Sequence, residues 1–428
     1  MVSGPLVGVR VLEFTQIIAG PFGCQFLADL GAEVIKVEPP QGEPWRLSQE
    51  FIPLESKTYQ SLNRGKKSLS VDLTDERIQA AIHALVPTVD IVVINYRPDV
   101  PERLKIDYET LRGIKPDLVY VDSTAFGRNG PWADKPGYDI VAQGVSGLTA
   151  SGARFDDHGT PLLPSIGVPT ADITTGYAIA MATLAALFHH QKTGEGQLVE
   201  TSLLANALQA QATGFMSLPL ADTLMRAPFL EELEQSKKDG KSYTEMANLR
   251  RTMQQGRQSG NIYYRNYLTS DGAIAIGNLS RSLRQKMRDA LEIEYDPRDD
   301  QPEYDPRAES SIKFGEELVE RVERMIAGNT TEYWVNHFEA AGVPVGEILF
   351  VEELIKHPQV TSNNYHVELE HELTGPQTMA ATPFTMSKTP PQPQGASPPL
   401  GRDTDAVLAE AGVSVEVIES LRADGVIR

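Results

Sequence analysis

The chain has 428 residues, of which 41% are hydrophobic and 23% charged, and its formal net charge at pH 7 is -19. This length allows two or three domains with sizeable cores, and the composition is that of a soluble globular protein. The acidic balance disfavours general binding to nucleic acids or to anionic membranes. A single cysteine, Cys24, excludes an intramolecular disulfide framework. The opening MVSGPLVG lacks a basic segment followed by an apolar block, so we expect no secretory signal and a cytoplasmic protein.

Residues 8–126 alternate between strand-like and helix-like periodicity. Five apolar runs predict strands: GVRVLEF (8–14), AEVIKVE (32–38), SLSVDL (68–73), DIVVINY (90–96) and LVYVDSTAF (118–126). Helices are expected between them at 20–31, 74–85 and 108–114. Strands that alternate with helices predict an α/β fold with a mostly parallel sheet covered on both faces. Ligands of such sheets bind beyond the carboxyl ends of the strands, so the loops after these strands are the places to search.

The rest of the chain mixes further helices with polar connections. Helices are expected at about 138–148, 173–191, 201–217, 280–291, 312–327 and 331–341, with a hairpin at 263–277 and a strand at 343–350. Residues 218–262 are polar and lack clear periodicity, so we interpret them as a connection that leaves the first domain. A proline-rich arm then leads to a short C-terminal helical piece.

The chemistry-bearing residues do not match the commonest short motifs. The eight histidines are scattered and no GxGxxG follows the first strand, so we expect neither a metal site nor a nicotinamide dinucleotide fold. A basic group does occur near the strand ends, made of Arg64, Lys66, Lys67, Arg97, Arg103 and Lys105. In a chain of large negative charge this group indicates a phosphate-bearing ligand, and Tyr96 beside Asn95 can offer an aromatic face to a base.

The segment PTADITTG (169–176) places one carboxylate, Asp172, at the start of a long apolar run. Two interpretations remain open. Asp is among the preferred N-cap residues, so Asp172 can serve simply as a helix cap. The start of a helix also stabilises an ionised carboxylate and presents free N–H groups that can steady an oxyanion. Such a carboxylate can attack an activated acyl group and form a covalent intermediate.

Several segments, in chain order, resemble the family III CoA-transferases, the group that includes formyl-CoA transferase and the carnitine CoA-transferases. They are VRVLEFTQIIAGPFGCQFLADLGAEVIKVEPPQGEP, NRGKKSLSVDL, VVINYRPDVPERLKI, GRNGPWADKPGYDIVAQGVSGL, PTADITTGYAIAMATLAALFHHQKTGEGQ, AAGVPVGEILFVEELIKHPQV and PPLGRDTDAVLAEAG. The resemblance implies transfer of CoA from an acyl-CoA donor, with succinyl-CoA preferred, to a small carboxylic acid. Asp172 would be the nucleophile that becomes acylated. CoA is then a substrate, and no tightly bound cofactor is implied.

The same resemblance implies how the chain is organised. It predicts an interlaced homodimer in which each chain has a Rossmann-like large domain and a smaller α+β domain. The large domain is expected to be built from both ends of the chain, 1–217 and 329–428, the latter including a wrapping tail. A linker and the small domain would occupy 218–328.

The resemblance also places the CoA contacts. The matching residues are Gln16, Ile17, Ile18, Ala19, Pro39, Val71, Asp72, Leu73, Thr74, Asn95, Tyr96, Arg97, Arg103, Pro136, Gly137, Tyr138 and Asp139. The family often has a basic residue at the position of Pro39, and Lys135 lies one position from a lysine that some members use. Formyl-CoA transferase carries a glycine run that shields the acylated Asp, whereas this chain has only GRQSGN (256–261). The small domain and this loop are together the candidate lid.

Two alternatives remain open. Acyl-CoA racemases and epimerases share the fold, but they use a His where this chain has Tyr138, so a two-base proton transfer would lack one partner. The other alternative is a CoA-binding module without turnover, in which Asp172 is only a helix cap.

Overall fold

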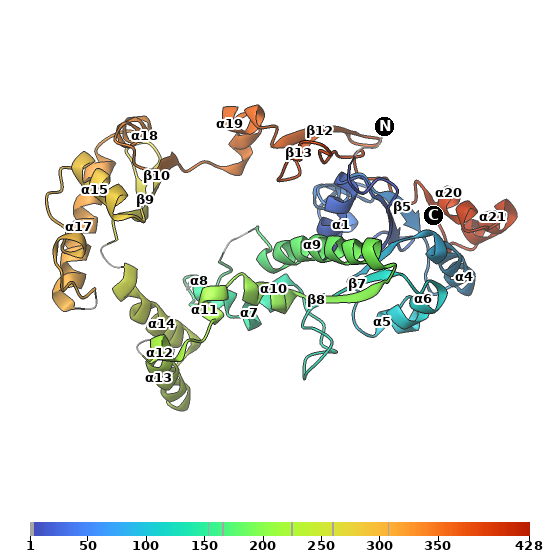
Figure 1. The fold of residues 1–428 in the computed structure, drawn as a ribbon, viewed down its shortest axis with the longest axis horizontal. Helices are drawn as coiled ribbons and strands as arrows, with labels where there is room; N and C mark the ends of the chain where they lie inside the picture. The colour runs from blue at the N-terminus through green and yellow to red at the C-terminus, as the bar shows by residue number, and fades with distance from the viewer. Residues whose placement is uncertain (1–3, 153, 165–166, 224–225, 259–260, 307) are drawn as a thin grey trace. The chain divides into compact units, whose positions relative to one another are not determined.

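The computed structural model describes residues 4–152, 154–164, 167–223, 226–258, 261–306 and 308–428, without the side chains of 251–258. The chain forms two compact units, which Figure 1 draws as one ribbon. The large unit consists of Met1–Asp156, Pro161–Met216 and Pro358–Arg428, and the small unit of Asp157–Thr160 and Ser217–His357. The large unit therefore draws on both ends of the chain.

A six-stranded parallel sheet forms the centre of the large unit. Its strands are β1 (Arg10–Phe14), β2 (Glu33–Glu38), β5 (Lys67–Ser70), β6 (Ile91–Ile94), β7 (Val119–Thr124) and β8 (Gln197–Ser202). They lie in the order β5-β2-β1-β6-β7-β8, and each neighbouring pair is parallel. The order reverses between β1 and β6, which is where ligands of open α/β sheets bind.

The five strands predicted from apolar runs are present, but the sixth strand was missed. Residues 201–217 were expected to be helical throughout, whereas β8 ends at Ser202 and helices occupy only α10 (Leu203–Gln209) and α11 (Ala212–Phe215). The reason is that β8 is an edge strand with half-exposed and exposed side chains, so it lacks the continuous apolar run of a central strand.

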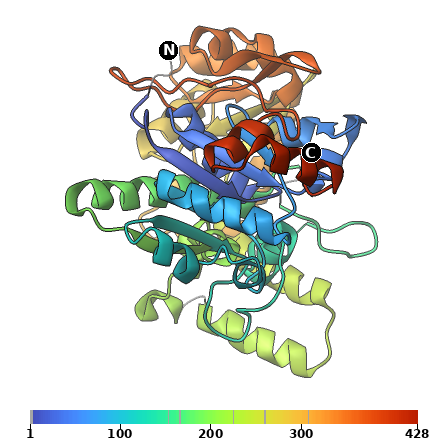
Figure 2. The same ribbon diagram turned by 90° about the vertical axis from the view of Figure 1, so that its right-hand side faces the viewer.

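Helices cover both faces of the sheet, as Figures 1 and 2 show. Along β1, Val11 packs with α1 (Ala19–Asp29) and α9 (Thr170–Thr193) on one face, and Leu12 packs on the other face. The second face is covered by α4 (Glu76–Leu85), α6 (Tyr108–Ile114), α20 (Thr404–Glu410) and α21 (Val415–Ala423). The two C-terminal helices are red in Figure 2 and complete the core under β2 and β5.

Helices α1 and α9 pack closely where the second turn of α9 passes α1. A Cβ on Gly176 would lie 2.7 Å from Cδ1 of Phe22 and 3.0 Å from the Ala19 carbonyl oxygen, so only a glycine permits this approach. By length and composition, α9 is apolar enough to cross a membrane, with mean hydropathy 1.4 in its most apolar window. Half of that window is buried against the rest of the chain.

The short elements of the large unit lie mainly in its loops. They are α2 (Pro44–Leu47), β3 (Glu50–Ile52), β4 (Glu55–Ser56), α3 (Lys57–Gln60), α5 (Val100–Arg103), α7 (Asp139–Val145), α8 (Leu148–Gly152), α19 (Pro358–Ser362), β12 (His366–His371) and β13 (Gly375–Ala380). The proline-rich arm that follows β13 contacts this unit, since the Pro398 carbonyl accepts a hydrogen bond from Arg46 and the Gln392 N–H donates to the Asp29 carbonyl.

The small unit contains a three-stranded antiparallel sheet and a set of helices. The predicted hairpin is confirmed as β9 (Tyr264–Leu268) and β10 (Ala273–Gly277), and β11 (Val345–Glu347) pairs with β10. Helices α15 (Arg281–Ala290), α17 (Glu309–Ala327) and α18 (Thr331–Ala340) pack on one face of this sheet. The small unit thus includes α18 and β11. The sequence predicts that the small domain ends at residue 328.

The interpretation of 218–262 as an aperiodic connection is wrong. This segment forms α12 (Pro219–Asp222), α13 (Arg226–Lys238) and α14 (Tyr243–Gln258). In α13, Ser236 alone among the described residues is buried, so the apolar stripe that predicts a helix is missing. Of the candidate lid 256–261, the backbone to Gln258 belongs to α14, and residues 259–260 lie outside the described residues.

The packing at Gly176 yields a testable prediction. Gly176→Ala should lower the thermal midpoint of the large unit by a few degrees, because overpacking costs about 1–3 kcal/mol and outweighs the usual helix gain. Gly113→Ala is the matched control, since a Cβ on that helical glycine meets no described atom within 4 Å. It should raise the midpoint slightly. Thermal unfolding followed by circular dichroism measures both, and equal shifts in the same direction would contradict the packing argument.

Candidate active site

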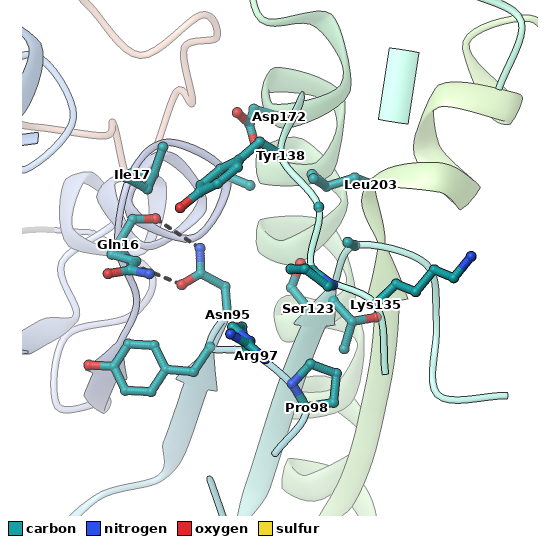
Figure 3. A pocket seen from close by; sticks show the side chains of 16 residues that line it. Gln16, Ile17, Asn95, Arg97, Pro98, Ser123, Lys135, Tyr138, Asp172 and Leu203 are labelled. Carbon is teal, nitrogen blue, oxygen red and sulfur yellow. Dashed lines mark hydrogen bonds between the residues drawn. The ribbon is translucent and has the colours of Figure 1, made fainter. Parts of the chain in front are cut away.

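A pocket opens at the carboxyl ends of β1, β6, β7 and β8 in the large unit (Figure 3). Its walls are formed by Gln16, Ile17, Ala19, Asn95, Tyr96, Arg97, Pro98, Ser123, Thr124, Ala125, Lys135, Pro136, Gly137, Tyr138, Asp172 and Leu203. Its volume is about 140 Å³. Sites that bury a drug-sized ligand measure roughly 300–1,000 Å³, so only the reacting end of a larger ligand fits inside this pocket.

The loop after β1 forms one wall and is clamped by Asn95. The Gln16 N–H donates to Oδ1 of Asn95 at 2.9 Å, and Nδ2 of Asn95 donates to the Gln16 carbonyl at 2.9 Å. Figure 3 shows this pair as two dashed lines. Because Asn95 follows β6 directly, the clamp joins the two strands between which the sheet order reverses. The clamp therefore holds the Gln16 main chain at the pocket wall.

Asp172 lies in the first turn of α9 and lines the pocket. Its side chain is buried, with the residue only 8% exposed. The N-cap of α9 is Pro169, and Asp172 is the third residue of the helix. The interpretation of Asp172 as a simple helix cap is therefore wrong, because the helix begins before it.

Asp139, the first residue of α7, caps α9 in place of Asp172. Its Oδ1 accepts hydrogen bonds from the N–H groups of Ala171 at 2.8 Å and Asp172 at 3.2 Å. Its Oδ2 accepts from Nε2 of Gln143 at 2.6 Å. The two helix N–H groups are thus already engaged, and they are not the free oxyanion donors that the sequence suggested.

The surroundings of Asp172 change its acidity. Burial raises the pKa of Asp172 to about 7, and the negative charge of Asp139 adds to the rise. An ordinary Asp pKa near 3.9 would leave this carboxyl ionised at neutral pH. In this chain the proton is instead released near neutrality. Asp172 is therefore placed where its protonation state responds to a bound ligand.

The basic group predicted to hold a phosphate is only partly at the pocket. Arg64 is buried with Asp29 at 2.7 Å and Lys66 with Glu13 at 2.9 Å, while Lys67 pairs with Glu33 on neighbouring strand β2 at 2.9 Å. Arg64 and Lys66 precede β5 and belong to the internal packing of the fold, and Lys67 is the first residue of β5, so none of the three lies at the carboxyl end of a strand. The interpretation of these three as ligand contacts is wrong.

The cationic residues of the pocket are Arg97 and Lys135. Arg97 is 62% exposed on its side chain and lies 3.5 Å from Asp99, a weak surface pair. Lys135 is exposed and its ammonium lies 5.4 Å from the ring centroid of Trp132. Arg103 and Lys105 are exposed in and beside α5, and neither lines the pocket. Arg97 and Lys135 can meet the negative charges of a large ligand at the pocket rim.

The structure brings together ten of the residues expected to contact CoA or to react. They are Gln16, Ile17, Ala19, Asn95, Tyr96, Arg97, Pro136, Gly137, Tyr138 and Asp172. Asp139 does not line the pocket, but its carboxylate accepts a hydrogen bond from the N–H group of Asp172. The pocket walls do not include Ile18, Pro39, Val71, Asp72, Leu73, Thr74 or Arg103. Of these, Val71 pairs with Ile427, so this segment is also tied to the C-terminal tail.

Sequence reasoning missed the far wall of the pocket. Ser123, Thr124 and Ala125 lie at the end of β7, and Leu203 begins α10 just after β8. The rule that ligands bind at strand carboxyl ends pointed to the first three, but no charged side chain marked them. Leu203 could not be placed because β8 was not recognised.

Metal-ligating side chains are not grouped in the described part of the chain: no three His, Cys, Asp or Glu residues are arranged to hold an ion. Cys24 is fully buried in α1, and burial raises the pKa of its thiol well above its ordinary value. A thiol in that state is a poor nucleophile. Asp172 is the carboxylate among the described walls of the pocket.

Comparison with known families decides the class. The family model described as CoA-transferase family III matches residues 6–404. The chain belongs to CoA-transferase family III. The match includes β1, the loop after it, the β6 end and the start of α9, so every wall of the pocket lies inside the family region.

Curated relatives align with nearly the whole length of the chain. The succinate–glutarate CoA-transferase of Agrobacterium fabrum is 33% identical over 423 residues, covering 95% of this chain and 95% of the relative. The human succinyl-CoA:glutarate CoA-transferase is 29% identical, covering 95% of this chain and 86% of the relative. The succinyl-CoA:mesaconate CoA-transferase of Haloarcula hispanica is 29% identical, covering 96% and 97%.

Solved structures of family III proteins share the fold. The Mycobacterium tuberculosis protein Rv3272 superposes with a TM-score of 0.74 at 27% identity, covering 95% of this chain and 100% of that one. A CaiB/BaiF family protein from Brucella suis gives a TM-score of 0.72 at 26% identity, covering 96% of this chain and 100% of the other. The mixed α/β architecture with its parallel six-stranded sheet is therefore that of the CaiB/BaiF family.

The raised pKa of Asp172 predicts a pH-dependent stability. A carboxyl whose pKa is higher in the folded than in the unfolded chain stabilises the fold at low pH, and that contribution is lost as pH rises from about 4 to about 7. Residue 172 cannot titrate in the Asp172→Asn protein. The thermal midpoint of this variant minus that of the wild type should therefore increase between about pH 4 and pH 7 and stay constant at higher pH. Calorimetric scans of both proteins between pH 4 and pH 9 measure the difference.

Asp139→Asn supplies the control for this prediction. The amide keeps an oxygen that can accept from the N–H groups of Ala171 and Asp172, but it removes the negative charge that raises the Asp172 pKa. In the Asp139→Asn protein the pKa of Asp172 should be lower, so the pH range over which stability is lost should end below 7. A midpoint difference between wild type and Asp172→Asn that does not vary with pH would contradict the assignment.

Proposed function

We propose that this protein moves CoA from an acyl-CoA donor to a free carboxylic acid, with Asp172 as the covalent relay. The observation that carries the proposal is the burial of this one carboxyl in the first turn of α9 at the pocket, with a pKa near 7. Membership of CoA-transferase family III supports the reaction class. CoA enters as substrate, and the chemistry needs no metal or prosthetic group.

The first step is attack of ionised Asp172 on the donor thioester. A carboxylate oxygen bonds to the thioester carbonyl carbon, the C–S bond breaks, and CoA leaves as a thiolate, which yields a mixed anhydride on Asp172. The wild-type chain at pH 7 holds a mixture of protonated and ionised Asp172. A cationic group or N–H donor close to the bound thioester would shift this balance toward the reactive carboxylate.

The remaining steps exchange the acids on Asp172. The thiolate attacks the aspartyl carbonyl carbon, which releases the donor acid and leaves an aspartyl thioester. The acceptor carboxylate then attacks that carbonyl, displaces the thiolate and forms a second anhydride. Return of the thiolate to the acceptor carbonyl gives the new acyl-CoA and regenerates Asp172. Water must be kept out because both anhydrides hydrolyse, and the apolar side chains of Ile17, Ala19 and Leu203 in the pocket wall favour its exclusion once a ligand fills the opening.

The names of the relatives support a choice of acids for this chain. Those named above act on succinate or succinyl-CoA with glutarate or mesaconate as the second acid. We propose succinyl-CoA as donor and a small dicarboxylic acid as acceptor. Because such an acceptor is a dianion, one of its carboxylates reacts at Asp172 and the other needs a cationic or N–H partner.

The proposal extends to assembly and location. Counting the strands of the large sheet in chain order gives 3-2-1-4-5-6, the order of doubly wound nucleotide-binding sheets, which supports a Rossmann-like large domain. Exposed apolar side chains of α9, among them Tyr177, Met181 and Phe188, support burial against a second copy in an interlaced homodimer. The single, buried Cys24 supports a cytoplasmic location.

The decisive test is chemical trapping. Wild-type protein is incubated with succinyl-CoA and hydroxylamine, and the adduct is mapped by mass spectrometry. We expect a hydroxamate at Asp172, because hydroxylamine cleaves both the anhydride and the aspartyl thioester. Asp172→Asn should show neither the adduct nor exchange of CoA between succinate and glutarate, with a loss of at least about a thousandfold in rate.

Three outcomes would overturn the proposal. If Asp172→Asn transfers CoA at an undiminished rate, the covalent relay is wrong. If deuterium from solvent enters the α position of an acyl-CoA without any CoA exchange, the protein is a racemase. Binding of CoA without adduct or exchange by the wild type would instead establish a binding module. Asp157→Asn, a substitution in the small-unit loop, serves as the surface control.

A further inference from the structure

One residue in the pocket wall has a strained backbone. Ile17 has φ of 71°, in the left-handed region, which is a true outlier for a β-branched side chain. Its neighbours do not share this conformation, since Ile18 has φ of -125°. Strain of this kind persists only where the surroundings impose it, and it gathers at functional sites. The side chain of Ile17 lines the pocket that holds Asp172.

The carboxylate of Glu43 imposes this conformation. Its Oε2 accepts a hydrogen bond from the Ile17 N–H at 2.7 Å, and the residue is only 2% exposed. A bond from an N–H to a buried carboxylate is among the stronger hydrogen bonds of proteins. Glu43 itself lies just before α2, on the loop that follows β2, so it reaches Ile17 from a different part of the chain.

Glu43 is in turn held by a buried lysine. Nζ of Lys36 lies 3.0 Å from Oε1 of Glu43 and donates to the Thr15 carbonyl at 2.8 Å. Burial raises the pKa of Glu43, and the Lys36 ammonium opposes that rise. The lysine therefore holds both the carboxylate that fixes Ile17 and the main chain two residues before it. On the far side, Asn95 fixes the Gln16 main chain.

We propose that Glu43 is a positioning residue for the proposed CoA transfer: it holds Ile17 in a left-handed conformation so that the Gln16–Ala19 loop is preformed to receive the thioester end of CoA. Without this bond, the backbone of Ile17 relaxes to negative φ, which reorients the peptide groups on both sides of it. The loop then has to be reordered at each binding event, and affinity falls accordingly. Glu43 acts through Ile17 and does not itself reach the pocket walls.

The chain contains a second bond from the N–H of a positive-φ residue to a glutamate, in this case at an exposed turn outside the pocket. Leu54 has φ of 66°, and its N–H donates to Oε2 of Glu50 at 3.2 Å. Leu54 and Glu50 are not among the pocket walls. Substitutions at this second pair therefore report what general loss of a strained turn does to the protein, without altering the Gln16–Ala19 loop.

The experiment combines a deletion with a specific rescue. Glu43→Ala should raise the Kd for CoA, measured by titration calorimetry, and the KM for succinyl-CoA by at least about tenfold. Adding Ile17→Gly should recover most of this loss, because glycine adopts left-handed φ without strain and needs no carboxylate to hold it there. Glu50→Ala should leave both constants within about twofold, and Leu54→Gly should not rescue Glu43→Ala.

Three results would overturn the proposed role of Glu43. Wild-type constants in Glu43→Ala overturn the proposal, as do equal rescue by Ile17→Gly and Leu54→Gly, which would mean a general effect on stability, or no rescue by either. If Glu43→Ala does not fold, Glu43→Gln keeps an acceptor oxygen for Ile17 and should raise the Kd less than Glu43→Ser. The CoA titration is independent of turnover. A wild type that binds CoA but shows no exchange refutes the proposed function and leaves this test intact.

Discussion

The carboxylate of Glu13 is completely buried at the end of the central strand β1, and a buried anion is tolerated only when it is paired. Lys66 lies 2.9 Å from its Oε2 and Lys36 3.4 Å from its Oε1, and both lysines are themselves buried. The same two ammonium groups donate to the carbonyls of Thr15 and Pro21. The two lysines that neutralise Glu13 therefore also hold the main chain on both sides of the Gln16–Ala19 loop, which forms one wall of the pocket.

A second constraint acts on the opposite wall, where α9 begins. Its first N–H groups need acceptors, and Asp139 supplies the carboxylate from a separate helix. This leaves Asp172 with a buried carboxyl beside a like charge, and both effects raise its pKa toward neutrality. The arrangement costs stability at neutral pH but keeps a carboxyl poised between its two protonation states. Such perturbed groups concentrate where chemistry is done.

Prediction from the sequence succeeded where elements are buried and failed where they are half-exposed. The four central strands β2, β1, β6 and β7 are near-continuous apolar runs because helices cover both faces of the sheet, and such runs stand out in a sequence. The edge strand β8 and helix α13 carry few buried apolar side chains, so neither shows a clear period. The prediction that Arg64 and Lys66 contact a phosphate failed because a sequence does not show which charged side chains are buried. Arg64 and Lys66 are drawn inside by Asp29 and Glu13, which are distant in the sequence.

The sequence by itself determined the α/β class and the edge of the sheet at which the pocket opens, and its likeness to family III singled out Asp172 as the candidate nucleophile. These features are carried by local apolar periodicity and by contiguous motifs. Only the tertiary structure decided that Asp139 caps α9, that Asp172 titrates near pH 7 and that Glu43 holds Ile17 in a left-handed conformation. Each depends on the burial and distance of groups that meet only after folding, and a linear pattern carries neither quantity.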